Sequence, residues 1–207
     1  MRQVSRQLGP KFLQALTALA KQGFQNAAEG LSGMTGVSLA VYDPTVNLVP
    51  LKDIPYVLGG PETDAVGIYL KMEGDISGHV LLIMPYQKAL EMVDLLMDEP
   101  SGTTQKLGSL ERSALAEVGN LTGTFFLNAL AEQTGLPSRP SPPAVIVDMV
   151  GSILDIITAL VGGIGDEVLM FQANFLIRDK EMNTDFWVIP DTSTLEKLTH
   201  EIINNNA

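Results

Sequence analysis

A carboxylate and a carboxamide lie three residues apart on a predicted helix in the second half of the chain. They belong to a stripe of polar residues that fall within about 60° of one another at about 100° per residue: Ser113, Glu117, Asn120 and Thr124. The flanking residues Gly119 and Gly123 leave little bulk beside this stripe and permit close approach. We therefore expect a partner surface to lie along the helix, with Glu117 and Asn120 reaching outward together.

Two structural interpretations of the same residues stay open. A helix of any globular protein shows a polar face, and a Glu followed three residues later by an Asn is common there. Gly119 and Gly123 could instead let two long helices pack closely. The arc next to the stripe is expected to face the core, and it contains Leu110, Ala114, Val118, Leu121 and Phe125.

The elements that position this helix follow from apolar periodicity along the chain. In the first half, spacings of three to four residues predict a long helix over 12–31 that stops around Gly33 and Gly36. The half is completed by a short extended piece over 37–42, a helical turn within 49–58, a hairpin with strands 66–72 and 79–84, and a helix over 86–97.

The second half repeats this order of elements. Its predicted members are a long helix over 109–134, a proline-rich bend over 137–143, a buried helix over 144–161, strands over 167–177 and 184–189, and a last helix over 193–204. Sliding one half against the other by 99 residues matches Gly36 with Gly135 and Pro44 with Pro143.

This repetition indicates an internal duplication within a single domain that spans residues 1–207, with halves at about 8–100 and about 105–205. Two antiparallel hairpins would merge into one sheet that packs the long helices on one face. The predicted fold class is therefore α+β with pseudo-two-fold symmetry.

Composition excludes several classes of function. The chain has 13 basic and 24 acidic side chains and a formal charge of −11, which would repel nucleic acid and anionic membrane surfaces. It has no cysteine and only two, widely separated, histidines, so we expect no disulfide, no thiol chemistry and no metal site. Asp148 and Asp155 interrupt the longest apolar region and no secretory leader is expected, which favours a cytoplasmic protein without a membrane span.

The spacing Ser113-x3-Glu117-x2-Asn120-x22-Pro143 resembles the signature of the CheC, CheX and FliY family of chemotaxis phosphatases. Neighbouring segments resemble the family as well: LERSALAEVGNLTG, PPAVIVDMVGSILD, GDEVLMFQANF and IPDTSTLEKL. The similarity extends from Leu8 to Leu198, and the length of the chain is closest to that of the CheC branch.

This resemblance implies a phosphatase that hydrolyses the aspartyl phosphate of the chemotaxis response regulator CheY. In the family the Glu pairs with a lysine of the regulator and the Asn orients the attacking water, and these roles fall on Glu117 and Asn120. The resemblance implies no cofactor of the protein's own, because the Mg²⁺ is bound by the regulator. Supporting or positioning roles are expected for Ser113, Gly119, Gly123 and Pro143.

The chain departs from the family in its first half. CheC proteins often carry the Glu and Asn pair twice, but the 99-residue offset places Ala18 opposite Glu117 and Lys21 opposite Asn120. A lysine there would repel the regulator's lysine, so the first half is expected to be a scaffold or a different contact surface.

Two other functions remain as alternatives. One is a non-catalytic chemotaxis adaptor that binds phosphorylated CheY or CheD, a receptor deamidase that is a known partner of the CheC branch. The other is a generic α+β binding domain with an accidental motif. His79 is expected to be a packing or surface residue rather than a catalyst.

Overall fold

The computed structural model describes residues 10–36, 38–50, 53–57, 59–161, 167–177, 180–191 and 193–198. The first half contains α2 (Pro10–Thr35), β1 (Leu39–Pro50), α3 (Ile54–Val57), β2 (Asp64–Gly74), β3 (Gly78–Pro85) and α4 (Tyr86–Leu96). The second half contains α5 (Ser109–Thr134), β4 (Ser138–Pro140), β5 (Ala144–Met149), α6 (Val150–Val161), β6 (Glu167–Ile177) and β7 (Lys180–Pro190). Residues 193–198 are also helical, and the rest of the predicted last helix lies outside the described residues.

All strands belong to one antiparallel sheet of seven strands. The order is β1-β6-β7-β3-β2, and the outer edge of β2 pairs with both β4 and β5. The two predicted hairpins, β2–β3 and β6–β7, meet at the β3–β7 pair in the middle of the sheet. The α+β fold class with merged hairpins is therefore confirmed.

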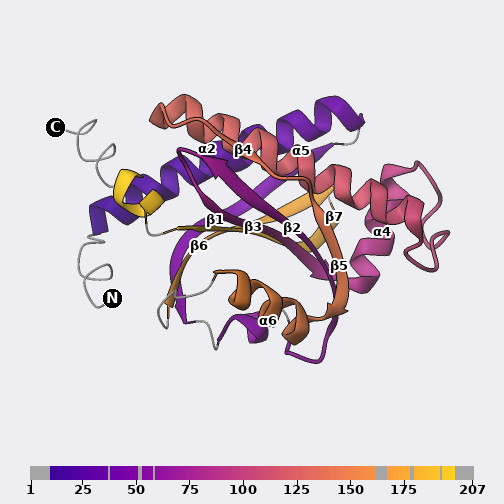
Figure 1. The fold of residues 1–207 in the computed structure, drawn as a ribbon. Coiled ribbons are helices and arrows are strands. Elements are labelled where there is room, and N and C mark those ends of the chain that lie inside the picture. Colours follow the sequence, from indigo (N-terminus) through magenta and orange to yellow (C-terminus); the bar gives the residue numbers. More distant parts are fainter. Residues whose placement is uncertain are drawn as a thin grey trace.

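Helices cover both faces of this sheet (Figure 1). The long helices α2 and α5 lie together across one face, as expected, whereas α6 and the short α3 lie against the other. The second face, for which no helix was predicted, also carries helices because β3 is buried on both sides. Its Val80 and Leu82 join the core beneath α2 and α5, while Leu81 and Ile83 join the core beneath α6.

Two glycines of α2 allow the long helices to pack closely. A Cβ atom on Gly23 would lie 2.9 Å from the ring of Phe126, and one on Gly30 would lie 2.6 Å from the ring of Phe125. Phe126 also packs against Phe24 and Phe186, with ring centroids 5.0 and 5.5 Å away. The close packing of the two helices thus depends on glycines of α2 rather than on Gly119 and Gly123 of α5.

Two predicted elements differ in the structure. Residues 144–149 form β5 instead of the first turns of a helix, because three β-branched residues, Val145, Ile146 and Val147, pair with the edge of β2. The first extended piece, predicted over 37–42, does not end at Tyr42, since β1 continues to Pro50. The strand register shifts between Tyr42 and Thr45, and an edge strand tolerates a proline at such an irregularity.

The two halves share their order of elements in space as well as in sequence. Helices α2 and α5 each span 26 residues and begin 99 residues apart. The same offset relates β1 to the β4–β5 segment, so that the irregularity near Pro44 corresponds to the break near Pro143. The assignment of one half as active and the other as degenerate stays a prediction.

Candidate functional site

Helix α5 presents the predicted stripe on its outer surface. The helix begins after Gly108 and ends at Gly135, which adopts a φ of 70° and donates its backbone N–H to the carbonyl oxygen of Ala131. Glu117 and Ser113 are exposed, and Asn120 is partly exposed. The opposite face is buried and consists of Leu115, Val118, Gly119, Thr122, Gly123, Phe126, Leu127, Ala129 and Leu130.

Gly119 and Gly123 lie on the side of α5 that faces the sheet, not on a surface open to a partner. A Cβ atom on Gly119 would collide with the side chain of Ile68 on β2. One on Gly123 would lie 3.6 Å from Leu70 and 3.7 Å from Pro140, which are ordinary contacts. The expected approach of a partner at these glycines is therefore wrong, and they set the distance between α5 and the sheet instead.

The expected core arc of α5 is displaced as well. Val118 is buried as predicted, but Leu110 is 65% exposed and Leu121 is only partly buried. The true core face includes Thr122, whose hydroxyl donates to the carbonyl oxygen of Val118 at 2.7 Å. Apolar residues are spread around α5, so their spacing does not define one buried face, and the observed core face includes Gly119 and Gly123.

The side chains of Glu117 and Asn120 form no hydrogen bond or ion pair with any other residue that the structure describes. Neither side chain is therefore committed to holding the fold together. Their positions are three residues apart, which corresponds to about 4.5 Å along a helix axis. Both groups can thus reach a single molecule placed against this face of α5.

Pro143 lies beside α5, in the connection between β4 and β5. Both strands contact α5, and β4 pairs with β2 through Met72 and Pro140. Ser141 fixes the connection, because its backbone N–H donates to the Lys71 carbonyl oxygen at 2.8 Å and its hydroxyl oxygen accepts the Lys71 N–H at 2.9 Å. Figure 1 shows this segment crossing in front of the helix.

The first half presents no equivalent pair. Gln14, Ala18 and Lys21 are exposed on α2, at the positions that match Ser113, Glu117 and Asn120. None of these three residues is a carboxylate, so the pairing of a carboxylate with a carboxamide is missing here. The predicted Glu and Asn pair thus lies on α5 and has no counterpart at the matched positions of α2.

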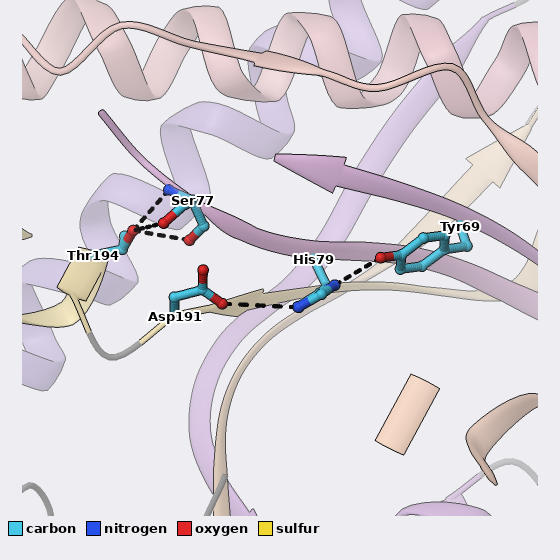
Figure 2. Close-up of polar contacts among 5 residues, drawn as sticks. All are labelled: Tyr69, Ser77, His79, Asp191 and Thr194. Carbon is cyan, nitrogen blue, oxygen red and sulfur yellow. Dashed lines mark hydrogen bonds and ion pairs between the residues drawn. The ribbon is translucent and has the colours of Figure 1, made fainter. Parts of the chain in front are cut away.

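His79 belongs to a different polar group, which sequence reasoning did not assemble. Its Nδ1 atom lies 2.8 Å from the Tyr69 hydroxyl, and its Nε2 atom lies 3.8 Å from the Asp191 carboxylate (Figure 2). Burial lowers the pKa of His79; the Asp191 carboxylate opposes this effect and Lys71 adds to it. Because His79 alternates with Val80 along β3, it faces the α6 side of the sheet, away from Glu117 and Asn120.

A second contact beside His79 anchors the helical residues 193–198. The Thr194 hydroxyl oxygen accepts the backbone N–H of Ser77 at 2.7 Å and donates to the Ser77 carbonyl oxygen at 2.8 Å (Figure 2). Lys197 donates to the carbonyl oxygen of Asp75 at 2.7 Å. These bonds join the end of the chain's second half to the β2–β3 turn, and we assign them a structural role.

Within the described ranges, no three His, Cys, Asp or Glu side chains gather closely enough to hold a metal ion. A search of the same residues finds no helix with the length and apolar character needed to span a membrane.

No family model matches the chain. The CheY-P phosphatase CheC of Bacillus subtilis is 26% identical over 180 residues, which cover 85% of this chain and 86% of that protein. A protein of Halobacterium salinarum named CheC1 is 25% identical over 191 residues, or 92% of this chain and 95% of its own.

Solved structures share the fold. FliY of Thermotoga maritima superposes with a TM-score of 0.74 at 18% identity, covering 95% of this chain and 98% of that one. CheX in the CheX–CheY–BeF3–Mg²⁺ complex from Borrelia burgdorferi gives a TM-score of 0.51 at 16% identity, covering 82% of this chain and 96% of the other.

Proposed function

Because the chain is a relative of the CheC, CheX and FliY family of chemotaxis phosphatases, we propose that it hydrolyses the aspartyl phosphate of a CheY-type response regulator. The curated relatives confirm the family resemblance and the predicted class of enzyme, a phosphatase. One observation supports the proposal most directly: the outer face of α5 presents a carboxylate and a carboxamide that no described residue engages.

We assign the docking role to Glu117. It is exposed, and a carboxylate forms a charge-assisted hydrogen bond with an ammonium group. The lysine of the regulator would supply that ammonium. Since both partners start in water, this contact contributes chiefly to binding and orientation.

We assign the water-orienting role to Asn120. Its amide can accept one hydrogen bond from a water molecule and donate another, and it does not compete as a nucleophile. Placed in line with the phosphorus, the water needs little further reorganisation, and positioning of this kind is a large part of phosphoryl-transfer catalysis. Ser113 is exposed one turn before Glu117, and Pro143 lies in the connection between β4 and β5, two strands that contact α5. Both would help to position the regulator.

The magnesium ion in this proposal belongs to the regulator. One relative of this fold has been solved as a complex of CheX with CheY, BeF3 and Mg²⁺. We place the protein with its regulator in the cytoplasm. CheD is a further proposed partner.

The decisive experiment measures phosphate release from a phosphorylated, Mg²⁺-loaded regulator in the presence of the protein. Asn120→Ala should lower the protein-dependent rate of phosphate release by roughly 100-fold or more while keeping affinity for the regulator. Glu117→Ala should lose affinity and turnover together. The matched control is Lys21→Ala, at the corresponding position of α2, which should leave the rate within a few fold.

Near-normal activity of Asn120→Ala would contradict the assigned mechanism. If the wild-type protein bound the phosphorylated regulator without accelerating phosphate release, the adaptor function would replace the phosphatase. A strong loss of activity in Lys21→Ala, with the fold intact by circular dichroism, would show that α2 takes part and that a one-site mechanism is wrong.

A further inference from the structure

A cavity of about 490 Å³ opens on the α6 side of the sheet, the side opposite α5. Strands β1, β2, β3, β6 and β7 contribute residues to it, together with the loop before β2 and the first residue of α6. Its lining residues are Tyr42, Gly59, Thr63, Ala65, Ile83, Met84, Pro85, Val150, Gln172, Asn174 and Asp185. A cavity of this size falls within the range of sites for small molecules.

A row of polar side chains crosses the floor of this cavity. Tyr42 pairs directly with Asn174, and Asn174 pairs directly with Asp185, which in turn pairs with Ile83. Residues that pair directly in an antiparallel sheet point to the same face, with Cβ atoms about 5 Å apart. A single small group can therefore contact both Asn174 and Asp185.

Asp185 is a buried carboxyl group that the proposed phosphatase mechanism does not use. It is 8% exposed, and its Oδ1 atom accepts a hydrogen bond from the Gln172 side chain at 2.6 Å. Burial raises the pKa of Asp185, and the Gln172 and Trp187 side chains partly offset this effect.

The other polar groups of the cavity favour a cation. Asn174 is partly exposed, and its side chain makes no hydrogen bond to a residue that the structure describes, so its amide oxygen is available. The described lining residues include no lysine, arginine or histidine, and the whole chain has a formal charge of −11. An anion would meet no compensating charge here, whereas a cation would compensate the desolvated carboxylate.

We propose that this cavity binds a small organic cation with N–H donors, of the primary-amine class, through the Asp185 carboxylate and the Asn174 amide oxygen. An ammonium group has three N–H donors and no acceptor, which suits two neighbouring acceptor groups. The apolar part of such a ligand would contact Ala65, Ile83 and Val150. A quaternary ammonium has the same charge but no N–H donor, so it should bind far less well.

The test is a titration of the isotope-labelled full chain with propylammonium at pH 7.5, followed by amide chemical shifts in NMR. Saturable shifts should appear at Thr63, Asn174 and Asp185. Tetramethylammonium and propionate, at equal ionic strength, should each bind at least about tenfold more weakly, because the first lacks donors and the second has the wrong charge. Equal shifts with all three compounds, or no saturable shift with propylammonium, would overturn the proposal.

Variants locate the site. Asp185→Asn keeps an acceptor for Gln172 but removes the charge, and it should weaken propylammonium binding at least about tenfold. Asn174→Ala should weaken it by a smaller factor, and it serves as the second variant if Asp185→Asn does not fold. The matched control is Asp155→Asn, an exposed carboxylate on α6, which should bind as the wild type does. Undiminished binding by both cavity variants would place the ligand elsewhere and refute the assignment.

Discussion

At the scale of single residues, the common face of Glu117 and Asn120 could be predicted from the sequence because their spacing fixes it on any helix. The role of the neighbouring glycines could not. The space beside each glycine is set by residues of other elements: Ile68 at Gly119, and Leu70 and Pro140 at Gly123. Which side of α5 is buried is therefore a property of packing between elements.

Gly119 provides a residue-scale prediction. Gly119→Ala should destabilise the fold by about 1–3 kcal/mol, because the new methyl group collides with Ile68 in a well-packed core. Gly123→Ala should be neutral or stabilising by up to about 1 kcal/mol, because its neighbours lie at ordinary distances and alanine favours helix. Urea unfolding measures both. In an Ile68→Ala background, which lacks the colliding Cγ2 atom, Gly119→Ala should cost less stability than it does in the wild type. Two equally stable glycine variants would contradict the packing described here.

At the scale of elements, Asp94 determines how α4 is connected to α5. It is 2% exposed, and its carboxylate accepts backbone N–H groups from Gly102 at 2.7 Å and from Thr104 at 2.8 Å. Hydrogen bonds, foremost that of the Thr104 side chain, lower the pKa of Asp94 below its ordinary value of 3.8. The carboxylate thus orders the loop that leads into α5.

The sign of the resulting pH dependence follows from the lowered pKa. The folded protein keeps Asp94 ionised more strongly than the unfolded chain does, so this stabilisation is complete above about pH 4 and is lost as the pH falls through the folded-state value. Asp94→Asn should therefore be less stable than the wild type at pH 7, and the difference should shrink toward pH 2. Urea unfolding at several pH values measures this. A difference that stayed constant with pH would show that ionisation of Asp94 does not matter.

Most elements, but not all, could be predicted from local pattern. The bounds predicted for α5 and β6 agree with the structure because caps, glycines and a strict two-residue period mark them locally. The run Ala144–Met149 is apolar and fits either a helix or a strand, and only the free edge of β2 decides for the strand. The polar row of Tyr42, Asn174 and Asp185 had no local signal, since strand register alone brings it together.

At the scale of the whole molecule, His79 joins the first hairpin to the segment after β7 through Tyr69 and Asp191 (Figure 2). Its lowered pKa means that the unfolded chain takes up a proton more readily than the folded protein does. Stability should therefore be full above the ordinary value of 6.5 and should decline as the pH falls from there toward the lowered folded-state value.

Comparison with His79→Gln tests this expectation. The variant should be less sensitive to pH between 7 and 5 than the wild type, because a glutamine keeps hydrogen-bonding capacity but does not titrate. The groups that face His79 are Tyr69, Lys71 and Asp191, and burial outweighs the opposing effect of Asp191. Should the wild type instead gain stability on acidification, the Asp191 contact would outweigh burial and the assigned sign would be wrong.

Each half supplies an edge strand to the hairpin of the other half: β1 pairs with β6, and β4 and β5 pair with β2. This arrangement has a consequence for the order of folding. Strand β1 pairs only with β6, and its Leu39 lies opposite Ile177, 138 positions later in the sequence. The centre of the sheet forms only when β7 pairs with β3. Such distant contacts slow folding. A nascent first half emerging from the ribosome should therefore keep open strand edges until about residue 190 is available. Fragments divided within 98–105 should each be unfolded alone and regain native circular dichroism only when mixed, and a stably folded 1–100 fragment would refute this dependence.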